Sequence, residues 1–249
     1  MPLIQVKNLS FTYPGSYTPV FENLEFMIDT GWRLGLVGRN GRGKTTLLKL
    51  LTGELRGTVS IYANTEFVYF PFDTDESKSA LDTMRESVAP FDRWTEKMNK
   101  LLLQNDSSSL AEWGELEQIF SANNGYQINE LLQKEAGRLG FDKEDLQRPF
   151  CSFSPGEQTR LKIAALFLKK NTFLLIDEPT NHLDFEGRRI VAEYLKTKKG
   201  FILVSHDRWF LDETIDHILA LHKSGIWVET GNYSGYREMK LIRDKSEAE

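Results

Sequence analysis

The segment Gly38-Arg39-Asn40-Gly41-Arg42-Gly43-Lys44-Thr45 decides the fold expected for this chain of 249 residues. It matches the pattern G-x-x-x-x-G-K-[ST] at every fixed position, with an apolar run before it and leucines at helical spacing after it. Glycines allow such a loop to curl until backbone N–H groups point inward at phosphate oxygens, and the dipole of the following helix adds to the attraction. The segment therefore predicts a phosphate-binding loop between a strand and a helix.

The same loop predicts how a nucleoside triphosphate and its Mg²⁺ are held. Lys44 is expected to reach the β- and γ-phosphates, and the Thr45 hydroxyl is expected to coordinate Mg²⁺. The predicted nucleotide-binding residues of this segment are Gly38, Arg39, Asn40, Gly41, Arg42, Gly43, Lys44, Thr45 and Thr46.

A second motif places two carboxylates at the end of an apolar strand. Residues 173–176 are Phe-Leu-Leu-Ile, and Asp177 and Glu178 follow them. Charges at the end of a buried strand lie at the carboxyl edge of the sheet, where open α/β sheets bind ligands. We expect Asp177 to hold Mg²⁺, often through water, and Glu178 to polarise a water for attack on the γ-phosphorus. The alternative is a strand that leaves the core through a solvated acidic turn.

Patterning along the rest of the chain predicts a nucleotide-binding α/β core with a helical insertion. Stripes of apolar residues predict helices from about 79 to 141, with a turn at 105–109. The predicted strands cover residues 3–6, 20–28, 32–37, 57–63, 66–70, 172–177 and 201–205. We therefore expect an ATP-binding core over 1–75 and 153–235, an inserted helical subdomain over 76–152, and the start of a linker helix over 236–249.

Composition excludes several classes of protein. No apolar run approaches the 18 residues of a membrane-spanning helix, and the N-terminus lacks the pattern of a secretory signal. The single cysteine, Cys151, cannot form an intramolecular disulfide, which suits the cytoplasm. A net charge of −5 gives no support to a DNA-binding domain.

The segment Phe153-Ser154-Pro155-Gly156-Glu157-Gln158 resembles the signature motif of ATP-binding cassette (ABC) proteins, usually Leu-Ser-Gly-Gly-Gln. The phosphate loop, this signature, the acidic strand and Ser205-His206-Asp207 occur in the family order, over about residues 1–235. The resemblance implies a P-loop NTPase of the ABC type, with an antiparallel β subdomain and an inserted α-helical subdomain. It also implies an ATPase that acts on Mg-ATP at sites shared between two cassettes.

The resemblance assigns further roles residue by residue. Signature residues Ser154, Gly156 and Glu157 would bind the ATP that the opposite cassette holds, and His206 would contact the γ-phosphate as the switch histidine. Asp184 matches the loop that bridges the two cassettes, and Tyr13 matches the aromatic that stacks on adenine.

Two positions depart from the family pattern. Pro155 replaces a glycine and removes one backbone N–H, although proline suits a first helical turn. Phe72 stands where the family usually has a glutamine that contacts Mg²⁺ and couples to a membrane partner, and phenylalanine offers no oxygen.

Several segments resemble the ABC-F branch, cytoplasmic two-cassette proteins without a membrane domain. They are Thr180-Asn181-His182-Leu183-Asp184, Ser205-His206-Asp207-Arg208 and Gly231-Asn232-Tyr233-Ser234, together with the long helical insertion. This resemblance makes the chain the first half of a ribosome-associated translation or antibiotic-resistance factor, with a second cassette as partner. The alternative is a transport ATPase that works as a homodimer with separate membrane subunits. A third possibility is an ATP-binding scaffold with little turnover.

Overall fold

The structure is a computed structural model that describes residues 3–104, 106–222 and 225–246. The chain divides into two compact units, Met1–Phe72 with Asn171–Glu249, and Asp73–Lys170. The second unit is larger than the insertion expected over 76–152, since it also contains residues 153–170. This difference arises because helix α6 (Pro155–Leu166) packs against helices α2 (Ala80–Val88) and α5 (Ile128–Gly137) of the same unit.

The first unit contains a three-stranded antiparallel sheet with the order β2-β1-β4. Its strands are β1 (Leu3–Phe11), β2 (Phe21–Asp29) and β4 (Thr58–Tyr62). Buried and exposed residues alternate along much of β1 and β2, as expected where one face of a sheet covers a core. This sheet corresponds to the antiparallel subdomain that the family resemblance implies.

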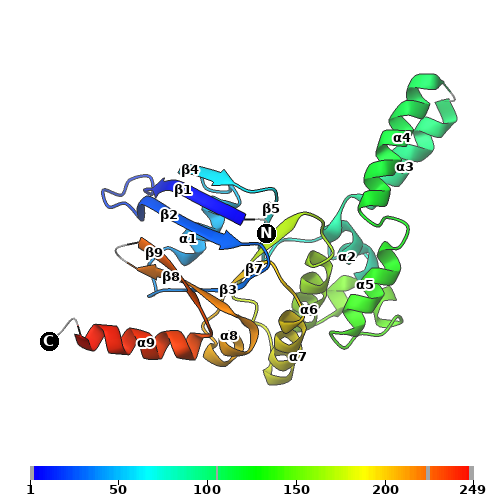
Figure 1. The fold of residues 1–249 in the computed structure, drawn as a ribbon. Helices are drawn as coiled ribbons and strands as arrows, with labels where there is room; N and C mark the ends of the chain where they lie inside the picture. Colours follow the sequence, from blue (N-terminus) through cyan, green and yellow to red (C-terminus); the bar gives the residue numbers. More distant parts are fainter. Residues whose placement is uncertain (1–2, 105, 223–224, 247–249) are drawn as a thin grey trace. The chain divides into compact units, whose positions relative to one another are not determined.

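A six-stranded sheet with the order β5-β6-β7-β3-β8-β9 completes this unit (Figure 1). Its strands are β3 (Arg33–Val37), β5 (Glu66–Phe70), β6 (Thr172–Asp177), β7 (Phe201–Val204), β8 (His217–His222) and β9 (Gly225–Thr230). All neighbouring pairs are parallel except β8 and β9. The carboxyl ends of β3, β6 and β7 therefore lie at one edge of the sheet, where the predicted motifs begin.

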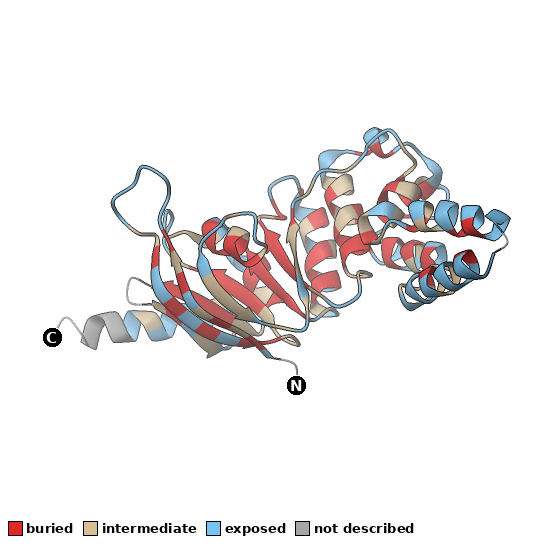
Figure 2. Ribbon diagram, turned by 90° about the horizontal axis from the view of Figure 1, so that it is seen from above, coloured by how far each residue is buried: buried red, intermediate tan, exposed pale blue. Residues whose placement is uncertain are grey.

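Helix α1 (Lys44–Leu51) joins the two sheets into one core. Four of its leucines belong to the same buried cluster as side chains from β1, β2, β3 and β6. Figure 2 shows the buried residues along the strands of the sheets. The other helices of the unit are α7 (Phe185–Lys196), α8 (Arg208–Thr214) and α9 (Tyr233–Ser246).

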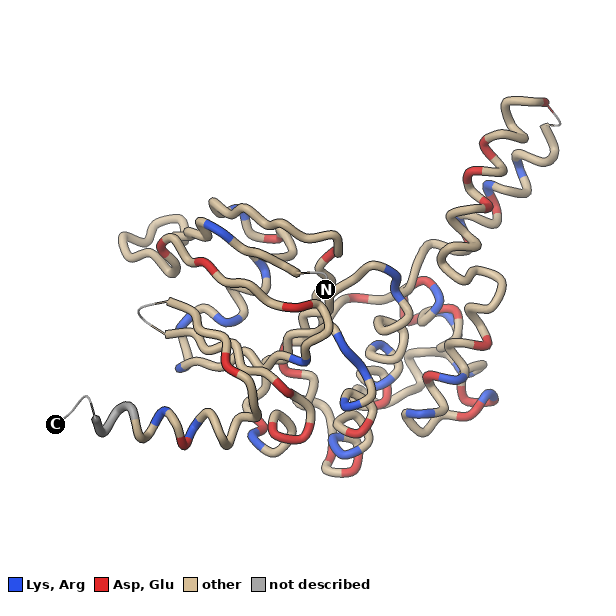
Figure 3. The backbone as a smooth tube through the Cα atoms, in the orientation of Figure 1, with Lys and Arg blue, Asp and Glu red and all other residues tan. Residues whose placement is uncertain are grey.

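The second unit is helical and includes a long helical hairpin. Its remaining helices are α3 (Phe91–Gln104) and α4 (Ser107–Ala122), which form that hairpin, and the short 3₁₀ turns Asp145–Gln147 and Phe150–Ser152. Residues with both signs of charge occur along the hairpin (Figure 3), and Lys97 pairs with Glu112 across it at 2.5 Å. The hairpin therefore carries mixed charge on its two helices.

The predicted strands and helices are present, although their ends differ by a few residues. The β-hairpin formed by β8 and β9 was not predicted. These two strands extend the sheet beyond β3. The tail helix begins at Tyr233, earlier than the predicted residue 236, and residues 247–249 of that prediction lie outside the described part. Among the described residues, no helix combines the length and the apolar character that crossing a membrane requires.

Candidate active site

The phosphate loop connects β3 to α1 and has a backbone that requires glycine. Gly41 and Gly43 have φ values of 76° and 90°, in the left-handed region. A Cβ on Gly43 would lie 2.7 Å from Val20 Cγ1 and 2.9 Å from Phe21 Cζ, closer than carbon atoms approach. The glycine at this position therefore gives both the turn and the room for the loop to lie against β2.

The first turn of α1 has backbone donors available to a ligand. Gly43 occupies the N-cap position and provides no side-chain cap, whereas α2, α4, α6, α7 and α8 are each capped by a side-chain oxygen. An uncapped helix start leaves N–H groups unpaired within the helix, and its dipole favours an anion. Lys44 Nζ donates to the Gly38 carbonyl at 3.2 Å, so the lysine lies over the loop.

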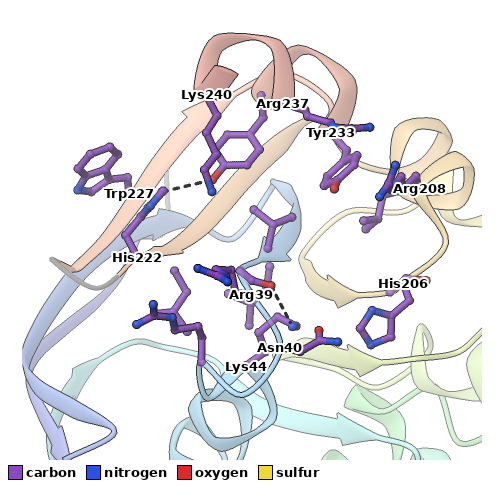
Figure 4. Close-up of a pocket in the computed structure, with 18 of the residues that line it drawn as sticks. Arg39, Asn40, Lys44, His206, Arg208, His222, Trp227, Tyr233, Arg237 and Lys240 are labelled. Carbon is purple, nitrogen blue, oxygen red and sulfur yellow. Dashed lines mark hydrogen bonds between the residues drawn. The ribbon is translucent and has the colours of Figure 1, made fainter. Parts of the chain in front are cut away.

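A cavity of about 720 Å³ adjoins the phosphate loop (Figure 4). None of the residues that line it is acidic, and six are cationic. The cationic residues are Arg39, Arg42, Lys44, Arg208, Arg237 and Lys240. Within the described part of the chain, none of the six forms an ion pair with a carboxylate. The cavity thus suits a ligand with several negative charges.

Asp177 lies at the end of β6 beside the phosphate loop. Its side chain is only 8% exposed, and its Oδ2 accepts hydrogen bonds from Thr45 Oγ1 at 2.8 Å and from the Tyr69 hydroxyl at 2.9 Å. The structure therefore brings together the two predicted metal ligands, Thr45 and Asp177. Burial and the neighbouring Asp177 charge raise the pKa of Tyr69 above its usual range, so its phenol remains a donor.

Glu178 and His206 also meet at this edge of the sheet. The His206 backbone N–H donates to Glu178 Oε2 at 3.2 Å, and His206 Nε2 lies 3.4 Å from Glu178 Oε1. Oε1 is buried and has no hydrogen-bond partner in the described structure. Burial raises the pKa of Glu178, while the hydrogen bond and the proximity of His206 act in the opposite direction. One oxygen of this carboxylate is therefore fixed by a hydrogen bond, whereas the other is buried without one in the described structure.

The donor atoms near the loop fit Mg²⁺. The described residues contain no group of three or more His, Cys, Asp or Glu side chains that would hold a metal by themselves. The available ligands are the oxygens of Thr45 and Asp177, and Mg²⁺ prefers oxygen donors completed by phosphate and water. Phe72, at the position of the expected glutamine, packs edge-on against the Phe70 ring, with centroids 6.3 Å apart.

Tyr13 lies close to the phosphate loop. Its hydroxyl is 2.8 Å from Thr46 Oγ1, its ring packs edge-on against Phe11, and the side chain is 44% exposed. An exposed aromatic face beside the loop is available for stacking. Stacking of Tyr13 on adenine stays a prediction.

Three of the other predicted residues, Ser154, Glu157 and Asp184, cap helices. Ser154 and Glu157 form a capping box at the start of α6: the Ser154 N–H and hydroxyl both donate to Glu157 Oε2 at 2.8 Å. These bonds lower the pKa of Glu157. Pro155 occupies the first turn, as the preference of proline predicts. Gly156 follows it in α6, and Asp184 caps α7 by accepting from the Gly187 N–H at 2.7 Å.

Comparison with known proteins identifies the family. The ABC transporter family profile matches residues 21–181, more than half of the chain. The chain is 32% identical over 230 residues to the probable ATP-binding protein YheS of Escherichia coli K12, covering 90% of this chain and 36% of YheS. It is 30% identical over 245 residues to the energy-dependent translational throttle protein EttA of the same strain, covering 92% of this chain and 43% of EttA. The chain thus spans less than half the length of either relative.

Two solved structures share the fold at low identity. A putative metal-chelate type ABC transporter in an inward-facing conformation aligns with a TM-score of 0.62 at 22% identity, over 92% of this chain and 84% of that one. A dimeric bacterial ABC transporter cassette aligns with a TM-score of 0.63 at 18% identity, over 91% of this chain and 98% of that one. These alignments confirm the predicted fold class. With the family profile and the residues gathered at the phosphate loop, they lead to one conclusion: the chain belongs to the ATP-binding cassette family and is an ABC-type ATPase cassette.

Proposed function

We propose that the chain binds Mg-ATP at the phosphate loop and hydrolyses it to ADP and phosphate when a second cassette completes the site. The observation that carries this proposal is the meeting of two carboxylates with the phosphate loop. Asp177 accepts a hydrogen bond from Thr45 of the loop, and Glu178 contacts His206 at the same sheet edge. A phosphate bound by the loop would thus lie beside both a metal-binding carboxylate and a general base.

Each residue has a distinct role in this proposal. Lys44 and the N–H groups at the start of α1 would bind phosphate oxygens, and Thr45 and Asp177 would hold Mg²⁺. The ion, when bound, neutralises charge on the phosphates. Glu178 would accept a proton from the attacking water, and its raised pKa makes it a stronger base than an exposed glutamate. His206 would contact the γ-phosphate.

Replacement of the proposed base tests this assignment. Glu178→Gln should keep ATP binding and lower turnover by roughly 10²–10⁴-fold, the usual contribution of a positioned base. Phosphate release and binding of a fluorescent ATP analogue would be measured on the same preparation. Glu25→Gln, on an exposed position of β2, makes the same change away from the site and should leave both unchanged. Native turnover in Glu178→Gln would remove Glu178 from the base role.

A second cassette would account for the exposure of Ser154 and Pro155 at the start of the signature helix. Ser154, at the start of α6, is exposed, and its hydroxyl is bonded only within its own helix cap. We infer that this hydroxyl and the Gly156 backbone N–H serve ATP held by the opposite cassette. Turnover should then rise faster than linearly with chain concentration. A strictly linear dependence would contradict a shared site.

We further propose that the cassette belongs to a cytoplasmic, ribosome-associated ABC-F protein, such as a translation or antibiotic-resistance factor. Two sequence features support this proposal: residues 180–184 resemble the ABC-F sequence, and Phe72 replaces the glutamine that couples transporter cassettes to a membrane partner. The similarity to a relative named a translational throttle protein supports it as well. The gene product would be expressed with Glu178→Gln and separated on a sucrose gradient with ATP. Co-migration with ribosomes is expected. Recovery with membranes would instead favour the alternative, a homodimeric ATPase with separate membrane subunits.

A further inference from the structure

Tyr69 is the side chain beside the proposed metal site that the sequence motifs did not identify. It lies on β5, which pairs in parallel with β6, so that Tyr69 stands opposite Leu175, two residues before Asp177. From there its hydroxyl reaches the Asp177 carboxylate at 2.9 Å. This contact results from the register between β5 and β6, which are about a hundred residues apart in the chain.

Two hydroxyl groups converge on the same carboxylate oxygen. Thr45 Oγ1 and the Tyr69 hydroxyl both donate to Asp177 Oδ2, and Oδ1 receives no hydrogen bond in the described structure. A carboxylate held by one donor can still rotate, whereas two donors from different elements, α1 and β5, fix its plane. Oδ1 is thereby held in one orientation and can accept a cation as its partner.

The Tyr69 hydroxyl can only donate a hydrogen bond to Asp177 Oδ2. An ionised carboxylate accepts and does not donate, so the phenol must be the donor. Thr45 can bind a metal through a lone pair and still donate its proton to Asp177. The two hydrogen bonds are therefore compatible with a metal ion at the site, and neither needs to break when the ion binds.

We propose that Tyr69 is a positioning residue for the Mg²⁺ site: its hydroxyl orients the Asp177 carboxylate so that the cassette binds the metal of Mg-ATP. The inference rests on the proposed function. Outer hydrogen-bond partners of metal ligands typically contribute about 10–100-fold to metal affinity. Phe72 offers no oxygen at the position of the family's glutamine, so the orientation of Asp177 carries more of the metal affinity here.

Tyr69→Phe removes one hydroxyl and retains the ring. Mn²⁺, used as the probe, would be titrated into the chain at saturating ATP and followed by electron paramagnetic resonance. ATP affinity would be measured separately in EDTA with a fluorescent analogue. We expect the Mn²⁺ concentration for half-saturation to rise about 10-fold, with metal-free ATP affinity unchanged. Tyr62→Phe, on an exposed part of β4, provides the matched control and should match the native chain.

The same measurements separate a positioning role from simple packing. In an Asp177→Ala background, Tyr69→Phe should have no further effect on Mn²⁺ binding, because the oxygen on which it acts is absent. Unchanged half-saturation in Tyr69→Phe, or an equal loss of ATP affinity with and without metal, would overturn the inference. Tyr69→Met, which also lacks a donor, gives the same two readouts if the phenylalanine variant does not fold. Failure of the native chain to bind ATP would instead contradict the proposed function itself.

Discussion

A methyl group added at Gly43 should destabilise the fold both through backbone strain and through a steric clash. Its φ of 90° is unfavourable for a residue with a Cβ, at about 1–2 kcal/mol. The new Cβ would also lie 2.7 Å from Val20 Cγ1 and 2.9 Å from Phe21 Cζ, and overpacking of this kind typically costs about 1–3 kcal/mol. Gly43→Ala should therefore reduce the free energy of unfolding by about 3 kcal/mol.

Gly53 provides the matched control for the backbone contribution. Its φ is 78°, and a Cβ there would meet no atom within 4 Å. Gly53→Ala should then lose only the conformational part, about 1–2 kcal/mol. At about 2–4 °C per kcal/mol for a chain of this size, Gly43→Ala should lower the unfolding midpoint by about 6–12 °C, clearly more than Gly53→Ala.

Thermal unfolding followed by circular dichroism measures both variants under one set of conditions. Titration with a fluorescent ATP analogue would follow binding at a temperature where both variants are folded. Because Val20 and Phe21 must move or the loop must shift, Gly43→Ala should also weaken ATP binding, whereas Gly53→Ala should not. Equal midpoints for the two variants would refute the packing argument. Native ATP affinity in Gly43→Ala would show that the loop tolerates displacement.

Three further predictions concern the charged and capping groups. Lys44→Ala should weaken ATP binding by about 10–100-fold, the usual contribution of a hydrogen bond to a charged group; native affinity in the same titration would contradict the phosphate assignment. Glu178→Gln should be more heat-stable than the native chain at pH 7, because burial raises the pKa of Glu178 and so disfavours its charged form in the folded state. That difference should shrink as the pH falls through the raised pKa and vanish below the ordinary value of about 4.3, where both states are protonated; a constant difference would contradict the shift. Ser154→Ala should cost about 1 kcal/mol by removing the α6 cap, and an unchanged midpoint in a urea titration would contradict the capping box.

The sequence predicts site residues best at positions where the chemistry allows only one or two types of amino acid. The loop up to Thr45 needs glycines, a lysine and a hydroxyl, and an apolar strand that ends in Asp177 and Glu178 is typical of the metal-binding edge of such a sheet. The parallel sheet and the helical insertion followed from apolar patterning. These features depend on short sequence motifs or on the periodic spacing of apolar residues, and both can be recognised in a single sequence.

Contacts that depend on the register between strands could not be predicted from the sequence alone. Tyr69 looks like one more aromatic in a strand until the pairing of β5 with β6 places its hydroxyl at Asp177. No strand was predicted at β8 or β9, although the apolar run 218–221 is as long as those of β6 and β7. The basic side chains Arg237 and Lys240 look like the solvated face of a tail helix, yet they line the same cavity as Lys44.

The backbone at Glu178 favours a role in turnover over that of a passive ATP-binding scaffold. Among the described residues, five other than glycine have positive φ, and four of them are asparagines, which tolerate this conformation. The fifth is Glu178, with a φ of 50° and a buried Oε1 that lacks a hydrogen-bond partner. Glycine or asparagine would fit that turn with less strain, and an amide or alcohol would bury no charge. Such costs concentrate where a reaction needs the group, and a cassette that only bound ATP would need Lys44 and the loop but no carboxylate held in this way.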